Sequence, residues 1–145
     1  MSSDFVYLVD TDVISERRKG TRCDAGVRAF FEQAEAAGTP LFVSVVTIGE
    51  LRRGVEKIRH RGDIAQADLL ERWLVDVCQA FPEAILPFDA DMAQLWGRLR
   101  VPHPENALDK QIAATALLHD LAVVTRNVAH FASTGVRLLN PFRGR

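Results

Sequence analysis

The stretch from Phe5 to Asp12 constrains the fold of this 145-residue chain more than any other. It reads Phe-Val-Tyr-Leu-Val-Asp-Thr-Asp, so a run of aliphatic and aromatic residues ends at two acids. Such a run is typical of a strand buried on both faces, and the acids mark the strand's carboxyl end. Ligands bind at that end in open α/β sheets, which makes Asp10 the first candidate for a chemical role. Alternatively, Asp10 or Asp12 caps a following helix.

Strand-like runs and helical patterns alternate along the rest of the chain. Further strands are expected at 41–46, 84–88, 121–125 and 136–139. Apolar residues at helical spacing predict helices over 27–38, 47–61, 70–81, 92–99 and 106–118, the second opening on a capping box from Thr47 to Glu50. The alternation predicts an α/β fold in which residues 1–145 form one domain, with a central, mainly parallel sheet and helices on both faces.

Composition excludes several classes of protein. No apolar run approaches the roughly 18 residues of a membrane span, and the first residues lack a basic segment followed by an apolar one, so we expect a cytoplasmic protein. Cys23 and Cys78 have no metal-ligand spacing and are expected to be free thiols. The net charge of -1 gives no global basic field for nucleic acid, although 15 of the 18 basic residues are Arg, whose planar fork suits phosphate.

Three acids are expected to meet at one edge of the sheet. Asp10 ends a strand, Glu50 and Asp109 begin helices, and Asn127 ends another strand. Two like charges about 4 Å apart repel by about 4 kcal/mol at an effective dielectric near 20, so such a cluster needs protons or a cation. Oxygen ligands without His or Cys favour Mg²⁺ or Mn²⁺, and this chemistry suggests metal-assisted hydrolysis of a phosphate ester.

Each acid also has a structural explanation. Glu50 could complete the capping box or pair with Arg53, and Asp109 could favour a helix N-terminus. These roles are common for single acids, so the functional interpretation depends on all three acids lying together.

Five short blocks of the sequence follow one another in a fixed order. They are 8–15 (LVDTDVIS), 44–54 (SVVTIGELRRG), 109–116 (DKQIAATA), 124–128 (VTRNV) and 138–142 (LLNPF). Together they span nearly the whole chain, and the ordered set is specific although each block alone is weak. In this order the blocks resemble PIN-domain toxins of the VapC or FitB-like type.

The resemblance implies a ribonuclease toxin of a type II toxin–antitoxin module. It would use Mg²⁺ or Mn²⁺ held by Asp10, Glu50 and Asp109, with water attacking the RNA phosphodiester. It also implies a small antitoxin that covers the acidic pocket, and assembly as a homodimer or a toxin–antitoxin hetero-oligomer. Thr125 and Asn127 match the last polar motif and would orient water or a ligand carboxylate.

Two positions depart from the family pattern. Asp12 stands where Asn or Ser is more usual, and it could add charge to the pocket or cap a helix. His130 stands where an acid is usual, which puts a second metal site in doubt. We interpret His130 as a surface histidine without a role.

The predicted RNA contacts are basic side chains near the first two motifs. The candidates are Arg53, Lys57, Arg59, Arg61, Arg17, Arg18 and Lys19. A solvated surface explains them equally well, and no aromatic residues interleave with them to suggest base stacking.

Two other functions fit parts of the sequence. Asp10-Thr11-Asp12 after a strand also resembles the first motif of haloacid-dehalogenase-type phosphatases, but Lys57 and Lys110 lie in the wrong context and no paired acidic motif follows. The other alternative is a PIN fold that binds an antitoxin and has lost its chemistry through the change at position 130.

Overall fold

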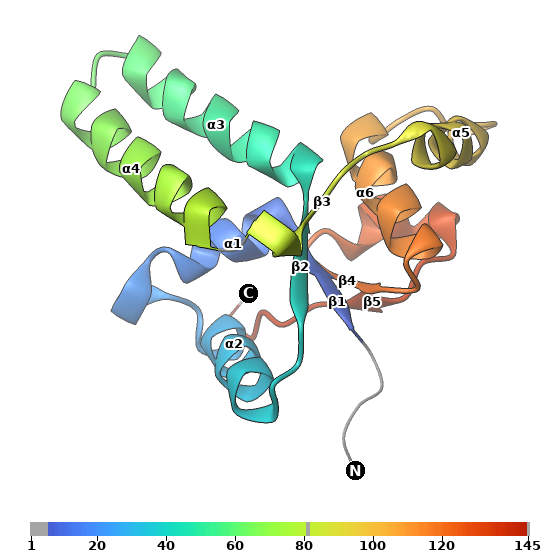
Figure 1. The fold of residues 1–145 in the computed structure, drawn as a ribbon, viewed down its shortest axis with the longest axis horizontal. Helices are drawn as coiled ribbons and strands as arrows, with labels where there is room; N and C mark the ends of the chain where they lie inside the picture. The colour runs from blue at the N-terminus through green and yellow to red at the C-terminus, as the bar shows by residue number, and fades with distance from the viewer. Residues whose placement is uncertain (1–5, 81, 145) are drawn as a thin grey trace.

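The computed structural model describes residues 6–80 and 82–144, and these form a layered α/β structure (Figure 1). Its sheet has the strand order β3-β2-β1-β4-β5, and each pairing between neighbours is parallel. The strands are β1 (Tyr7–Val9), β2 (Leu41–Ser44), β3 (Ile85–Leu86), β4 (Ala122–Val124) and β5 (Leu138–Leu139). The predicted α/β fold with a mainly parallel sheet is confirmed. Phe5 and Phe81, placed in a strand and a helix by the sequence, lie outside the described residues.

Helices connect the strands. The α-helices are α1 (Thr11–Arg17), α2 (Ala25–Ala37), α3 (Val45–His60), α4 (Ile64–Ala80), α5 (Ala90–Leu99) and α6 (Ala107–Leu118). Three 3-10 segments accompany them: η1 (Gly20–Arg22), η2 (Pro82–Ala84) and η3 (Val128–Thr134). Over the described ranges, none of the helices combines the length and the apolar character needed to cross a membrane.

The two faces of the sheet carry separate cores because successive side chains of a strand point to opposite faces. Leu8 is buried on one face with residues of α6 and β4, including Ile112 and Val123. Val9 is buried in the other core with residues of α1 and α2, including Val27. Figure 1 shows α5 and α6 on one side of the sheet and α1 and α2 on the other. Both faces are therefore covered by helices, as predicted.

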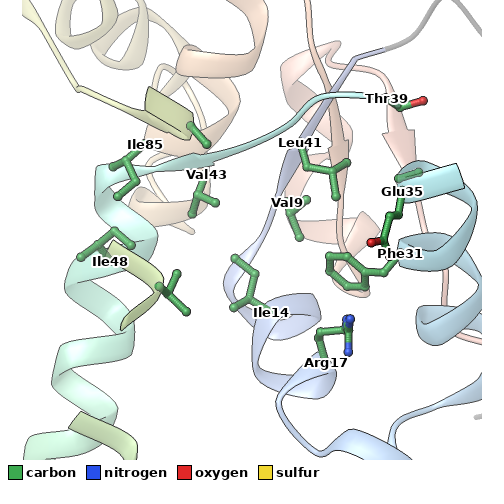
Figure 2. A pocket seen from close by; sticks show the side chains of 13 residues that line it. Val9, Ile14, Arg17, Phe31, Glu35, Thr39, Leu41, Val43, Ile48 and Ile85 are labelled. Atoms are coloured by element: carbon green, nitrogen blue, oxygen red, sulfur yellow. The ribbon is translucent and has the colours of Figure 1, made fainter. Parts of the chain in front are cut away.

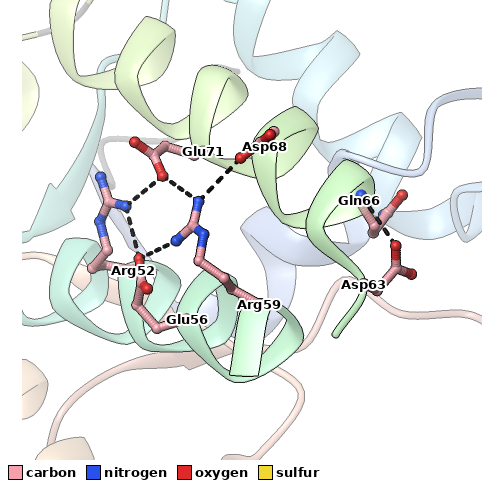
Figure 3. A network of polar contacts seen from close by, with 7 residues as sticks. All are labelled: Arg52, Glu56, Arg59, Asp63, Gln66, Asp68 and Glu71. Atoms are coloured by element: carbon pink, nitrogen blue, oxygen red, sulfur yellow. Dashed lines mark hydrogen bonds and ion pairs between the residues drawn. The ribbon is translucent and has the colours of Figure 1, made fainter. Parts of the chain in front are cut away.

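Helices α3 and α4 pack against each other as an antiparallel pair that extends beyond the sheet (Figure 1). Their contact contains a third apolar cluster built around Leu51, Val55 and Leu70. An ion-pair network adds to this contact: the Arg59 guanidinium lies 2.6 Å from carboxylate oxygens of both Glu56 and Glu71 (Figure 3). The pair is thus held by apolar packing and by charge.

Helix α3 begins earlier than predicted. Ser44 is its N-cap, and the Ser44 hydroxyl accepts a hydrogen bond from the Val46 backbone N–H at 3.0 Å. Thr47 is fully buried inside the helix, so the predicted capping box is wrong and the predicted strand is two residues too long. The β-branched run Val45-Val46-Thr47 favours a strand locally, but the Ser44 cap and tertiary packing decide for helix. Glu50 consequently lies in the second turn of α3.

Candidate active site

Asp10 is buried at the carboxyl end of β1 and caps α1. Asp10 is only 3% exposed, and its Oδ1 atom accepts a hydrogen bond from the Thr11 backbone N–H at 2.8 Å. Oδ2 accepts a second hydrogen bond from the Thr125 hydroxyl, also at 2.8 Å. Burial, followed by the charge of Asp12, raises the pKa of Asp10 to about 7. The capping and site explanations are therefore compatible, because one carboxylate caps the helix and carries a perturbed pKa.

Asp12 has one carboxylate oxygen without a partner. Oδ2 accepts a hydrogen bond from the Arg126 backbone N–H at 3.0 Å. Oδ1 is buried and has no hydrogen-bond partner within the part of the chain that the structure describes. Burial raises the pKa of Asp12 as well. A buried carboxylate oxygen without a partner is costly, and cation binding is one way to satisfy it.

Glu50 contacts the first residue of α1 through a hydroxyl group. The Thr11 Oγ1 atom lies 3.2 Å from Glu50 Oε1 and 3.2 Å from the Thr47 hydroxyl. The side chains that converge on Thr11 come from α3, 36 and 39 positions along the chain. This contact places the Glu50 carboxylate beside the residue that follows Asp10.

Asp109 lies in the first turn of α6 and contacts His130 of η3. The Asp109 Oδ2 atom is 2.8 Å from His130 Nδ1, with the two side chains 20% and 46% exposed. The negative charge of Asp109 also raises the pKa of both Asp10 and Asp12. His130 is exposed, as predicted, and it contacts a predicted metal ligand. The interpretation that it has no role stays a prediction.

The polar motif after β4 supports Asp10. Thr125 is fully buried, and besides donating to Asp10 its hydroxyl accepts a hydrogen bond from the Asn127 backbone N–H at 3.0 Å. Asn127 is exposed and fixes the Thr125 hydroxyl through its backbone. A role for the Asn127 side chain stays a prediction.

The oxygen atoms of the site are of the kind that a hard divalent ion prefers, but as placed they do not form a closed set of ligands. Carboxylate and hydroxyl oxygens dominate the site, and one buried carboxylate oxygen has no partner. Across residues 6–80 and 82–144, no three His, Cys, Asp or Glu side chains lie close enough together to hold a metal ion. Glu50 and Asp109 are only partly buried, whereas Asp10 is buried. A metal role for these acids stays a prediction.

The predicted RNA-binding side chains have different surroundings. Arg59 is shared among Glu56, Glu71 and Asp68 in the α3–α4 network (Figure 3). The guanidinium of Arg17 lies 5.3 Å from the Phe31 ring centre, and that of Arg18 lies 6.0 Å from the Trp73 ring centre. The remaining candidates are exposed, namely Arg53, Lys57, Arg61 and Lys19, the last paired with Glu16. Of the seven, Arg59 is the side chain held by several ion pairs.

A separate apolar groove of about 510 Å³ lies between α2 and the α3–α4 pair, over the face of the sheet (Figure 2). Its walls include Phe31, Leu41, Val43, Ile48 and Val77. Two charged side chains, Arg17 and Glu35, line it as well. None of the predicted catalytic acids lines this groove, so it is distinct from the acidic site.

Three contacts of the site were not predicted from the sequence. Thr11 contacts Glu50, the Arg126 backbone contacts Asp12, and His130 contacts Asp109. Thr11 and Arg126 directly follow buried residues at strand ends, which was an available signal. The His130 contact depends on the packing of η3 against α6, and no local pattern in the sequence indicates that packing.

Comparison with known proteins gives consistent similarities. The family model described as PIN domain matches residues 7–135. The VapC ribonuclease Y4jK of Sinorhizobium fredii is 32% identical over 144 residues, covering 94% of this chain and 98% of that protein. Toxin FitB of Neisseria gonorrhoeae is 31% identical over 142 residues, covering 94% of this chain and 99% of FitB.

Solved structures show the same similarity. The crystal structure of FitAcB from Neisseria gonorrhoeae contains a chain that is 30% identical, with a TM-score of 0.79, over 94% of this chain and 98% of that one. The structure of FitAB bound to an IR36 DNA fragment gives a TM-score of 0.80 at 28% identity, over 97% and 98% of the two chains.

Proposed function

Because this chain belongs to the PIN-domain family, we propose that it is a divalent-metal-dependent endoribonuclease and the toxin of a type II toxin–antitoxin module. The similar proteins carry the names VapC ribonuclease and toxin FitB, which supports this proposal. The observation that carries it is the buried Asp10 carboxylate at the sheet edge: burial, then the charge of Asp12 and last that of Asp109, raise its pKa. Perturbed acids of this kind are typical of functional sites.

In this proposal Asp10, Glu50 and Asp109 hold Mg²⁺ or Mn²⁺. When bound, such an ion neutralises phosphate charge and lowers the pKa of water for attack on a phosphodiester. Thr125 orients Asp10 by donating to its Oδ2, and Thr11 orients Glu50. His130 orients Asp109, and Asp12 adds a carboxylate oxygen next to Asp10. The exposed cations Arg53, Lys57 and Arg61 contact the RNA backbone, and the reaction takes place in the cytoplasm.

The test is cleavage of RNA by the purified protein after chelator treatment, with Mg²⁺ or Mn²⁺ added back. Asp10→Asn and Asp109→Asn should abolish cleavage and weaken Mn²⁺ binding measured by calorimetry, while circular dichroism stays unchanged. Asp76→Asn, an exposed acid on α4, is the control and should behave as wild type. Full cleavage by either site variant would refute the assignment.

We propose that the apolar groove binds an apolar segment of a small antitoxin (Figure 2). Similar chains come from structures titled FitAcB and FitAB, and other similar folds come from structures titled as toxin–antitoxin complexes. The groove is too apolar to suit a phosphate backbone, while its Arg17 and Glu35 offer charge partners to a peptide. Assembly as a toxin–antitoxin hetero-oligomer follows from the same proposal, whereas a homodimer stays a separate prediction.

The groove is tested with two substitutions on one helix. Val77→Arg places a charge in the groove, whereas Val75→Arg changes an exposed residue of the same helix that does not line it. The first should abolish co-purification with the small protein encoded beside this gene and the second should not. Equal binding by both variants would move the interface elsewhere.

A second candidate function is an antitoxin-binding module without catalysis. It is favoured by His130 at the position where the resemblance implies an acid, and by the lack of a closed three-ligand cluster in the described residues. RNA left intact at every Mn²⁺ concentration, together with retained antitoxin binding, would establish it. The phosphatase alternative has less support, because Lys110 is buried and donates to the His103 carbonyl, and Lys57 lies exposed on α3.

A further inference from the structure

A second hollow, of about 160 Å³, lies beside the acidic site between α1, α3 and α4. Glu50 and Thr11 line it where it adjoins the site. Arg18 and Trp73 line it as well, from α1's C-terminal end and from α4, so a cation and an aromatic ring meet in a pocket that also holds a predicted catalytic acid. Neither the acids' role nor the apolar groove accounts for this combination.

We propose that this hollow binds one nucleobase of the RNA, adjacent to the phosphate that is cleaved, with the base stacked on the Trp73 indole. The inference rests on the proposed ribonuclease function and adds a base-binding subsite to it. Stacking of a base on an aromatic side chain tolerates every base, because each base has a π-face. No sequence pattern indicates a stacking site. Trp73 is 55 positions from Arg18, and the two side chains lie together only because of the packing of α4.

Trp73 is suited to act as a rigid platform. Its ring packs against the buried cluster of Leu51, Val55 and Leu70, yet the residue is only partly buried. A ring anchored on one side loses little freedom when a ligand stacks on it. The platform is therefore formed before RNA binds.

Arg18 is free to move from the Trp73 ring to a bound RNA. It is exposed, and its guanidinium lies 6.0 Å from the Trp73 ring centre, at the outer limit of a cation–π contact. Little is lost when it moves from the ring to a phosphate next to the bound base, and a planar guanidinium can also cover the second face of that base.

The polar lining gives the base edge partners. Ser15 and Thr11 are polar residues of the lining. The Ser15 hydroxyl can donate or accept a hydrogen bond, and the Thr11 hydroxyl, which donates to Glu50 or Thr47, can still accept one. Leu51, Val55 and Ile58 line the remainder. An apolar slot with a few polar groups suits a flat heteroaromatic ring better than it suits a phosphate group, which needs several cationic or N–H donors.

Gly54 provides a way to block the hollow. It lines the pocket from α3, and a Cβ atom added there would meet no heavy atom within 4 Å. Gly54→Leu therefore extends a side chain into the hollow without disturbing the backbone. Gly97→Leu is the matched control, because Gly97 lies in α5 with equally open space and does not line this pocket.

The direct test uses the emission of Trp73. Trp96→Phe removes the other tryptophan, and Asp10→Asn prevents cleavage. A single-stranded RNA tetranucleotide should quench Trp73 emission saturably, and the same oligonucleotide with one abasic position should bind about tenfold more weakly. The affinities of the variants are measured by fluorescence anisotropy of a labelled RNA, because the Trp73 variants have no tryptophan in this background. Gly54→Leu and Trp73→Ala should lower affinity for the intact RNA to that of the abasic one, Trp73→Phe should keep most of it, and Gly97→Leu should have no effect.

In the cleavage-competent protein, Trp73→Ala and Gly54→Leu should raise KM several-fold with little change in kcat, and Trp73→Phe should stay close to wild type. RNA binding detected by anisotropy without any change in Trp73 emission would overturn the inference, as would equal affinity of the Gly54→Leu variant. Quenching by the antitoxin but not by RNA would also overturn it. Absence of cleavage by wild type together with Trp73 quenching would instead refute the ribonuclease function and leave the base site standing.

Discussion

The Nδ1 atom of His130 lies 2.8 Å from Oδ2 of Asp109, across 21 positions of sequence. Asp109 belongs to α6 and His130 to η3, so this contact depends on the packing of these two segments. Partners that hold a metal-binding carboxylate tune metal affinity, so the proposed function predicts that His130 influences the metal site without being an acid itself.

Replacing His130 should change metal binding. His130→Ala should weaken Mn²⁺ binding by about tenfold, because loss of a partner that orients a ligand typically costs 10–100-fold. His130→Asp adds a carboxylate beside Asp109 and should allow a second Mn²⁺ to bind. Calorimetry measures both effects, and His119→Ala, an exposed histidine that follows α6, is the control. Unchanged affinity in His130→Ala would show that the contact does not support the site.

Replacing Asp10 should stabilise the fold at the expense of function. Its pKa is raised from 3.8 to about 7, so the folded protein binds the Asp10 proton more tightly than the unfolded chain does. The stability of the metal-free protein therefore falls as pH rises from about 4 to 7, by up to about 4 kcal/mol.

Asp10→Asn removes this cost. In chelator, urea denaturation should show the variant more stable than wild type at pH 8, with the difference shrinking toward pH 4. Comparing the two proteins at each pH isolates Asp10 from other titrating groups. A pH-independent difference would contradict the raised pKa.

Loss of the Thr125 hydroxyl should harm both stability and the site. Thr125→Val leaves the buried Asp10 Oδ2 and the Asn127 N–H without this partner, which should cost about 1–3 kcal/mol. Thr115→Val is the control: Thr115 is also fully buried, but its hydroxyl contacts the Gln111 carbonyl and Met92 away from the acids. Urea denaturation and Mn²⁺ titration should separate the variants, with metal affinity lowered only for Thr125→Val.

Gly26 permits the C-terminal residues to dock on α2. A Cβ atom there would lie 2.0 Å from the Pro141 carbonyl oxygen, and the Asp24 carboxylate accepts hydrogen bonds from the Arg143 and Gly144 backbone N–H groups. These bonds, led by that of Gly144, lower the pKa of Asp24 to about 2.

Gly26→Ala should therefore destabilise the protein by about 1–3 kcal/mol through steric overlap. Gly97→Ala, in open space within α5, should be neutral or stabilising because alanine favours helix. Thermal unfolding of the two variants measures the difference. Equal melting temperatures would show that the C-terminal segment moves aside without cost.

The sequence by itself determined the order and type of most elements and the acids of the proposed site. Apolar patterning is a local property, so the run ending at Asp10 and the almost wholly apolar body of α6 could be recognised without knowledge of their neighbours. The same local evidence misplaced the start of α3, because a β-branched run favours a strand until Ser44 caps a helix.

Tertiary structure alone decided which side chains meet. Thr11 with Glu50, Asp109 with His130, and Arg18 with Trp73 are pairs from different elements, and each contact depends on how those elements pack. It also decided that the pKa of Asp10 is raised, because a pKa depends on burial and on the positions of neighbouring charges. Burial and contact arise only when distant segments fold together, so no single stretch of sequence encodes them.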